Sequence, residues 1–117
     1  SLMRVFFLIK NIKRKVQIMY AMLTQKLSKG FKSWSDMLKE NKDKLDRHGM
    51  TLIYAGSHAD DDNSMIAIIH WESKEGMMSF KNDEELTKIR EEAGAITEST
   101  EVKVLTDESL HNIPKAL

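Results

Sequence analysis

The apolar positions between residues 28 and 48 recur with the period of an amphipathic helix. Ser28 is a favourable N-cap residue at the start of this stretch, and Gly49 suits the position after the last helical residue. On the side of this helix opposite the apolar positions, most side chains between residues 39 and 47 are charged. The pattern predicts a helix with a buried stripe that consists of Phe31, Trp34, Leu38 and Leu45.

A second helical stretch is predicted from Ser73 to Gly94. Ser73 is again a suitable N-cap, and Glu75 places a negative charge in the first turn, where the helix dipole favours it. Residues 82–85, Asn-Asp-Glu-Glu, are typical of a helix start, so we expect the helix to break and restart there. The apolar stripe of the two halves consists of Met77, Met78, Phe80, Leu86, Ile89 and Ala93.

Four strands are predicted in the remaining segments. Residues 16–24 and 65–71 are apolar at nearly every position, which is typical of central strands that are covered on both faces. Residues 51–57 and 96–105 mix apolar and polar positions, so they are expected to be outer strands with one wetter face. Residues 59–63, Ala-Asp-Asp-Asp-Asn, have the composition of a hairpin loop.

The predicted order of elements is β, α, a β–β hairpin, α, β, which indicates an α+β fold of the ferredoxin-like βαββαβ type. In that fold the first and third strands lie at the centre of an antiparallel sheet, as the two most apolar segments require. We assign residues 16–107 to this domain, residues 1–15 to an N-terminal extension and residues 108–117 to a C-terminal tail. A chain of 117 residues has room for one such domain.

Composition excludes several classes of site. The chain has no cysteine, so disulfides, thiolate nucleophiles, iron–sulfur clusters and thiolate zinc sites are ruled out. No apolar run approaches the length of about 20 residues that spans a bilayer. The run from Val5 to Ile9 is too short for the core of a signal peptide. We therefore expect a cytoplasmic protein that has no membrane partner.

Charge is unevenly distributed along the chain. Eight basic residues and no acid precede Asp36, although the net charge of the whole chain is zero. A basic stretch can indicate contact with nucleic acid. However, residues 10–15 contain no interleaved aromatic residue and no nucleic-acid-binding motif. We expect a solvated or self-pairing face there, and no nucleic-acid partner.

Three segments carry a resemblance to known proteins: residues 26–34 (KLSKGFKSW), residues 70–75 (HWESKE) and residues 96–102 (ITESTEV). On these segments the chain resembles a largely cyanobacterial family of the dimeric α/β-barrel superfamily, which includes antibiotic-biosynthesis-type monooxygenases. The resemblance covers about residues 17–107. It implies a homodimer in which two sheets meet across a two-fold axis, with ligand pockets between the sheet and the helices. Function does not follow from such a fold.

The haem-degrading members of that superfamily allow a direct test. They carry a Trp within the second helix and a haem-ligating His ten residues later. Alignment from Trp71 places Phe80 and Arg90 at these two positions. Neither side chain can ligate iron, so no haem is expected, and the sequence indicates no other cofactor.

His70 and Trp71 are predicted at the end of the third strand, where pockets of the superfamily often open. His70 could act as a general base near neutral pH with Trp71 as a pocket wall, or the two could be a sheet-end His and a core Trp. Met77 and Phe80 could line an apolar pocket or fill the core. The candidate ligand-binding residues are Tyr20, Trp34, Tyr54, His70, Trp71, Met77 and Phe80.

His58 and the acidic residues that follow it suggest a metal site, but the pattern fails. An EF-hand loop counted from Asp60 lacks the required Gly and Glu. If the hairpin turns near residues 61–62, His70 faces about Ile53 and lies roughly 15 Å or more from His58, at ~3.3 Å per residue. We expect an acidic hairpin tip in solvent and no metal.

We therefore predict a small homodimer that binds a small apolar or aromatic molecule between the sheet and the helices. Two alternatives stay open: a cofactor-independent monooxygenase-like enzyme with His70 as base, and a structural or stress-related dimer. No spacing typical of serine hydrolases, nucleotide-binding loops or zinc proteases supports another class. A cavity reached by His70 favours the enzyme, and a cavity without it favours the binding protein. Solid packing around Trp34, Trp71 and Phe80 favours the structural dimer.

Overall fold

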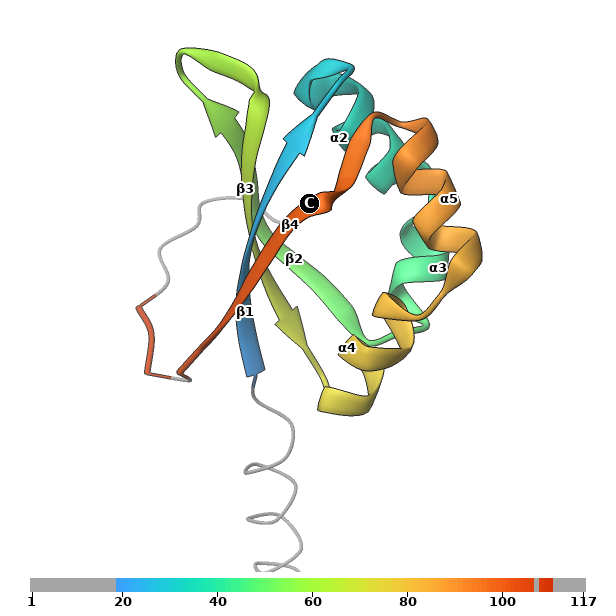
Figure 1. Ribbon diagram of the computed structural model, residues 1–117. Coiled ribbons are helices and arrows are strands. Elements are labelled where there is room, and N and C mark those ends of the chain that lie inside the picture. The colour runs from blue at the N-terminus through green and yellow to red at the C-terminus, as the bar shows by residue number, and fades with distance from the viewer. Residues whose placement is uncertain (1–18, 107, 111–117) are drawn as a thin grey trace, which may run out of the picture.

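The computed structural model describes residues 19–106 and 108–110, in which helices cover one side of a four-stranded antiparallel sheet (Figure 1). The strand order β2-β3-β1-β4 places β1 and β3 at the centre, as predicted, and the α+β ferredoxin-like fold class is confirmed. The strands are β1 (Met19–Leu27), β2 (Met50–His58), β3 (Asp61–Trp71) and β4 (Ala95–Leu105). The helices are α2 (Gly30–Glu40), α3 (Lys42–Asp46), α4 (Lys74–Lys81) and α5 (Glu84–Glu92).

The two faces of the sheet differ in how deeply their side chains are buried. Successive side chains of a strand point to opposite faces, and along β3 every second side chain, from Met65 to Trp71, is buried, whereas Ile66, Ile68 and His70 are only half-buried. We call the helix-covered side the covered face and the other side the open face. The open face carries Tyr20, Met22, Ile53, Tyr54, Ile66, Ile68 and His70.

The first predicted helix is divided in two, because Asn41 interrupts it. The Asn41 side chain donates a hydrogen bond to the carbonyl oxygen of Met37 at 2.8 Å, and its backbone N–H donates to the same oxygen at 3.1 Å. Such local side-chain bonds compete with regular helix. The predicted stripe nevertheless packs inward, since Trp34, Leu38 and Leu45 are buried and Phe31 lies against the core.

The prediction that Ser28 caps this helix is wrong. The acidic hairpin between β2 and β3 supplies the acceptors instead: Asn63 Oδ1 accepts from the Gly30 N–H at 2.9 Å, and Asp62 Oδ2 accepts from the Phe31 N–H at 3.3 Å. Ser28 Oγ donates to the carbonyl oxygen of Gly94 at 3.3 Å. The hairpin therefore anchors the start of α2, a role that sequence spacing does not reveal.

The second helical stretch breaks where predicted. Ser73 Oγ accepts from the Gly76 N–H at 3.0 Å at the start of α4, and Asp83 Oδ1 accepts from the Leu86 N–H at 2.9 Å at the start of α5. Gly76 lies so close to the carbonyl oxygen of His48 that a Cβ there would clash with it. This close approach seats α4 on the loop between α3 and β2.

The remaining predictions about the chain ends fall largely outside the described residues. The extension at residues 1–15, the first three residues of the predicted strand at 16–24, and most of the tail at 108–117 belong there. Within the described part of the chain, no helix has the length and apolar character needed to cross a bilayer.

Candidate functional site

A recess of about 530 Å³ lies on the covered face between the sheet and the pair α4 and α5. We call it the covered-face recess. Its floor is apolar and comes from the central strands, its wall comes from α4, and its rim is polar. The lining residues are Ala21, Leu23, Ile69 and Trp71 (floor), Met77, Met78 and Phe80 (wall), and Lys81, Thr87, Arg90, Thr97 and Thr100 (rim), with Val102 beside the rim.

Helix α4 forms the wall because its apolar side closes only partly onto the sheet: Met77 and Phe80 pack against the core but stay half-buried. None of its residues is buried, although Met77, Met78 and Phe80 form an apolar stripe. Met78 is 41% exposed. An apolar stripe of this kind normally packs against a core, so here it faces space that a bound molecule can fill.

Aromatic rings define one end of this recess. The Phe80 ring centroid lies 5.3 Å from that of Trp71, at an interplanar angle of 51°. The guanidinium carbon of Arg90 lies 5.2 Å from the Phe80 ring centroid, within the range of a cation–π contact. Phe80 and Arg90 are the two positions compared above with the haem-degrading proteins, and here they contact each other.

Hydroxyl groups line the polar rim. Thr100 Oγ1 accepts a hydrogen bond from Gln25 Nε2 at 2.6 Å, which leaves the Thr100 O–H available as a donor. Thr97 Oγ1 donates to a carboxylate oxygen of Glu91 at 3.2 Å. The rim can therefore offer both donors and acceptors to a polar group on a bound molecule.

Arg90 is the charged group that lies deepest in this rim. Partial burial lowers the pKa of Arg90, and the neighbouring charge of Glu91 acts in the opposite direction. Within the described residues, its guanidinium makes no hydrogen bond and no ion pair. The N–H groups of its guanidinium therefore remain available as hydrogen-bond donors at the edge of an apolar recess.

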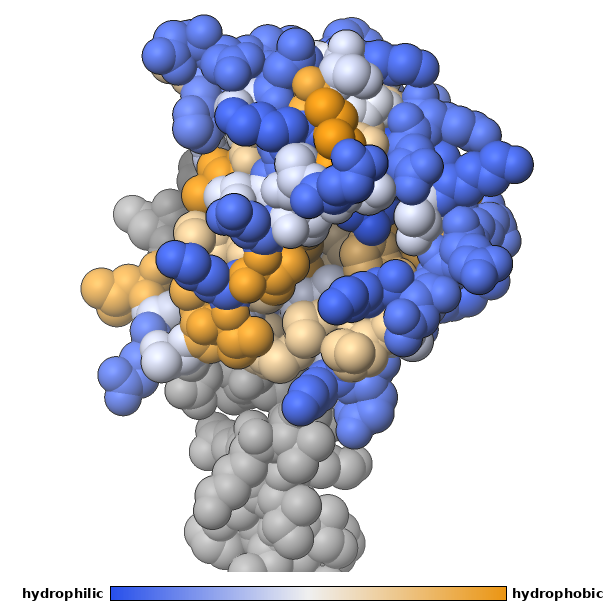
Figure 2. All heavy atoms as spheres, viewed as in Figure 1, coloured by the Kyte–Doolittle hydropathy of each residue, from blue (hydrophilic) through white to orange (hydrophobic). Residues whose placement is uncertain are grey.

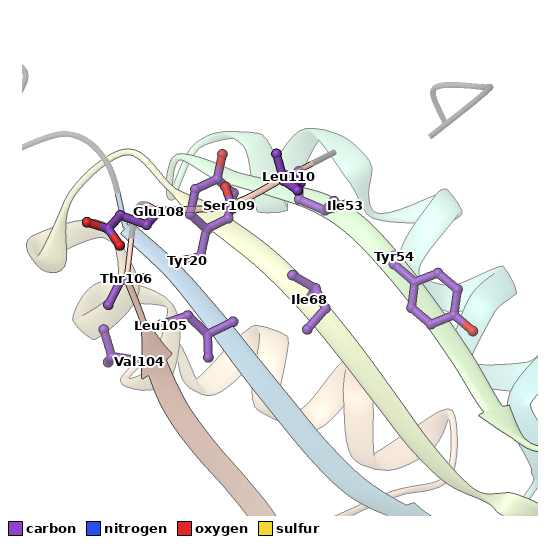
Figure 3. A pocket seen from close by; sticks show the side chains of 10 residues that line it. All are labelled: Tyr20, Ile53, Tyr54, Ile68, Val104, Leu105, Thr106, Glu108, Ser109 and Leu110. Atoms are coloured by element: carbon purple, nitrogen blue, oxygen red, sulfur yellow. The ribbon is translucent and has the colours of Figure 1, made fainter. Parts of the chain in front are cut away.

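A second recess of about 610 Å³ lies on the open face (Figure 3). Tyr20 and Ile68 come from the central strands, Ile53 and Tyr54 come from β2, and the end of β4 with residues 108–110 forms the other side. Figure 2 shows apolar side chains gathered along the C-terminal half of β4. Tyr54 is 56% exposed and Val104 is 62% exposed.

The seven sequence-predicted site residues separate into three groups. Trp71, Met77 and Phe80 line the covered-face recess. Tyr20 and Tyr54 line the open-face recess, and His70 lies beside Tyr20 with their ring centroids 5.0 Å apart. Trp34 lines neither, since it is 4% exposed in the core.

His70 is the residue whose position differs most from its predicted role. It pairs with Tyr20 across β1 and β3, and therefore points to the open face, away from Trp71. Its partner on β2 is Thr51, not Ile53 as predicted. The hairpin turns at residues 59–60, earlier than expected, and the register shifts at a bulge between Leu52 and Tyr54.

The hairpin acids serve structural roles in the described part of the chain. Asp61 accepts hydrogen bonds from the Asn63 N–H at 2.9 Å and from Ser64 Oγ at 3.0 Å, and these bonds lower the pKa of Asp61. His58 pairs with Asp61 across the turn. No three His, Asp or Glu side chains among the described residues come together as a metal site would require.

A Ser–His–Asp cluster, which the sequence analysis missed, joins the helices. His48 Nδ1 lies 2.6 Å from Ser79 Oγ, and His48 Nε2 lies 2.9 Å from Asp83 Oδ2. Ser79 Oγ donates to the carbonyl oxygen of Gly76 at 2.9 Å. Its hydrogen is thus committed to its own helix, so the cluster fastens α4 and α5 to the end of α3.

The basic residues that precede Asp36 have structural partners where the structure describes them. Lys26 Nζ donates to Ser64 Oγ at 2.6 Å, and Lys29 Nζ donates to the carbonyl oxygen of Glu92 at 2.8 Å. Lys32 Nζ pairs with Asp36 at 2.6 Å. These lysines therefore join elements of the fold. The other five basic residues lie outside the described part.

Sequence reasoning also missed the rim of the covered-face recess. Arg90 follows Leu86 by four residues and Ile89 by one, so it lies at the edge of the buried stripe of α5. That spacing is a signal for a half-buried charge. Thr97 and Thr100 gave no signal, because the irregular pairing of β4 near Lys26 sets their direction.

Solved structures with the same fold come from several bacteria. SnoaB, a cofactor-independent oxygenase from Streptomyces nogalater, is 11% identical, with a TM-score of 0.55 over 85% of this chain and 99% of that one. A NIPSNAP-like domain protein from Burkholderia xenovorans is 12% identical, with a TM-score of 0.56 over 86% and 94%. A NIPSNAP family protein from Agrobacterium tumefaciens is 14% identical, with a TM-score of 0.55 over 76% and 86%. At these identities the likeness establishes the fold alone.

The family comparison covers most of the chain. No curated protein matches the sequence significantly. The model of one family, described as Domain of unknown function (DUF3764), matches residues 18–107. That segment holds all four strands and all four helices described above. The chain therefore belongs to the DUF3764 family.

Proposed function

We propose that the protein is a homodimer that binds a small apolar or aromatic molecule in the covered-face recess. The observation that carries this proposal is an apolar recess lined by Trp71, Met77 and Phe80, but not by His70. A recess without a poised base supports a binding protein over an enzyme that uses His70. The volume of about 530 Å³ lies within the usual range for small-molecule sites, roughly 300–1,000 Å³.

The ligand-binding part of the proposal has a direct first test. Protein purified from its source cells is examined by native mass spectrometry under gentle and under denaturing conditions. We expect a dimer that carries a small molecule, and denaturation should release the molecule for identification. A dimer that is consistently empty would instead support the structural reading.

The location of the ligand is tested by filling one recess at a time. Met77→Trp places a large ring in the covered-face recess, whereas Leu110→Trp adds the same ring beside the open-face recess. We expect 2-naphthamide, a neutral aromatic probe, to bind wild type and Leu110→Trp but not Met77→Trp in calorimetric titrations. The reverse pattern would move the site to the open face.

The pairing of two copies through the open face is supported by the sequence and the burial pattern together. The two central strands are apolar on both faces, yet the described helices cover one face. Met22, Ile66 and Ile68 stay half-buried on the other face. A second copy of the same sheet would cover these residues in a self-complementary manner.

The cellular location of the protein is a separate part of the proposal. The absence of cysteine suits a reducing compartment, and we propose the cytoplasm of a bacterium, with cyanobacteria as the group the sequence most resembles. Fractionation of source cells, followed by immunoblotting, tests this. Recovery in a membrane or secreted fraction would contradict it.

A further inference from the structure

We infer that the molecule bound in the covered-face recess carries an acidic group, such as a carboxylate or a phenolate, and that Arg90 binds this group. The inference rests on the proposed function and specifies its ligand class: a planar apolar body with a single anionic oxygen group. The body would lie on the floor against Trp71 and the wall of α4, and the anionic group would lie at the polar rim.

The first argument is the cost of an uncompensated charge. A charged group that is removed from water without a partner is strongly disfavoured, unless an opposite charge or hydrogen bonds compensate. Arg90 is half-buried, and no described residue forms a hydrogen bond or ion pair with it. An anionic group in the recess would supply the missing partner.

The second argument concerns the nearest acid. Glu91 is adjacent in sequence and exposed, and its carboxylate accepts a hydrogen bond from Thr97. It therefore does not occupy the guanidinium of Arg90, whose planar donors stay available for bidentate binding of a carboxylate.

The third argument is the chemistry around Arg90. Lys81 adds a second positive charge to the lining and, like Arg90, makes no ion pair with a described residue. Thr100 offers a hydroxyl donor, because Gln25 already donates to its oxygen. Two cations and a hydroxyl donor among the lining residues of an apolar recess form an electrostatic complement to an anion.

The fourth argument is that Arg90 is held in place. Its guanidinium carbon lies 5.2 Å from the Phe80 ring centroid, and Phe80 in turn lies against Trp71. A side chain stacked in this way loses less conformational freedom when it binds a ligand. The same ring that contacts the apolar body of the ligand thus positions the charge that binds its acidic group.

The test uses two probes of matched shape, 2-naphthoate and neutral 2-naphthamide, titrated calorimetrically into the full-length protein. Wild type should bind the anion about tenfold more tightly or better, as a charge-assisted hydrogen bond allows. Arg90→Gln should lose that preference while its affinity for 2-naphthamide stays unchanged. Lys81→Gln should reduce the preference by a smaller factor.

The control variant is Lys103→Gln, which removes an exposed positive charge from β4 opposite Met22 on the open face. It should keep the full preference for the anion. If Arg90→Gln does not fold, Arg90→Met is the second variant, because Met fills the same space without charge. It should show the same loss of preference.

The outcomes separate this inference from the proposed function. Equal affinity of wild type for the two probes, or a preference that survives Arg90→Gln or Arg90→Met, would overturn the anionic ligand but leave the binding site in place. Failure of both probes to bind wild type would overturn the proposed function and this inference with it.

Discussion

The covered and open faces of the sheet are built from the same strands, yet they are stabilised in different ways. On the covered face Ala21, Met65 and Ala67 are almost completely buried under helices. On the open face their sequence neighbours Met22, Ile66 and Ile68 are equally apolar but half-buried. Hydrophobic burial scales with the area removed from water, so the covered face contributes far more to folding of a single copy.

The comparison shows that the apolar character of a residue does not determine how deeply a single copy of the chain buries it. An apolar residue that one copy leaves half-covered contributes little to its folding, but it can contribute to association with another surface. The covered face adds a complication of its own, because the stripe of α4 is only partly packed against the sheet. Its incomplete packing is what creates the recess.

The largest expected effect comes from truncating the covered face. Met65→Ala should lower the free energy of unfolding by about 2–5 kcal/mol, because the side chain is fully buried and leaves a cavity. Urea denaturation followed by circular dichroism measures it. The matched control is Leu105→Ala, which lies opposite Tyr20 on the open face and is 38% exposed; it should cost about 1 kcal/mol or less. Equal losses of unfolding free energy would show that the two faces contribute equally to the stability of a single copy.

A charge on the open face should break association while sparing the fold. Ile68→Lys points away from the helices and should weaken self-association by about 100-fold or more, since the two copies would bring like charges together. Light scattering after size exclusion measures the mass. Glu40→Lys on the exposed end of α2 is the control and should stay dimeric. A dimeric Ile68→Lys protein would place the interface elsewhere.

The helix that forms the wall of the recess depends on its cap. Ser73→Ala removes the acceptor for the Gly76 N–H and should cost about 1 kcal/mol of unfolding free energy. Thermal and urea denaturation measure the loss, with Ser109→Ala in the tail as control. If Ser73→Ala were as stable as wild type, the start of α4 would have to be held by its contact with the loop at His48.

His70 distinguishes a structural role from a chemical one. His70→Ala removes a half-buried ring that contacts Tyr20 on the open face, so we expect a loss of less than about 1 kcal/mol of unfolding free energy. Affinity for 2-naphthamide should not change, because the residue faces away from the covered-face recess. Loss of soluble dimer would show that His70 is essential to the interface proposed on this face, and loss of ligand binding would contradict the assignment of the recess.

The smallest effect concerns acid stability on the covered side. Hydrogen bonds from the Leu86 N–H and from His48 lower the pKa of Asp83. The stability that Asp83 provides is therefore fully present above about pH 4 and is lost as pH falls below that value. Asp83→Asn keeps a good N-cap residue and should flatten this acid decline in thermal melts between about pH 5 and pH 2. An unchanged decline would exclude Asp83 as its source.

Much of the fold could be predicted because it follows from local patterns. The period of Trp34, Leu38 and Leu45 gave the first helical stretch, and the break at Asp83 followed from its capping residues. The apolar run at 65–71 correctly indicated a central strand. The cap at Ser28 failed, because its competitors, Asp62 and Asn63, lie about 30 residues away in the chain.

The candidate site was predictable only in part, for the same reason. The apolar side chains of Trp71, Met77 and Phe80 and their predicted places in the strand and helix suggested them as site residues. The structure brings these three residues together around one recess. Adjacent residues on a strand point to opposite faces, so His70 could not share that recess with Trp71. The bulge at Ile53 and the irregular pairing of β4 also shift side chains in ways that no sequence period encodes.

The sequence by itself determined the element types, their order and the two central strands, since these depend on hydrophobic period, caps and composition within short segments. Only the tertiary structure decided that Arg90 rests on Phe80 beside the covered-face recess, that the acidic hairpin caps α2, and that His70 faces the other side of the sheet. These features join residues distant in the chain, and their geometry depends on register, bulges and helix placement, which local propensity does not fix.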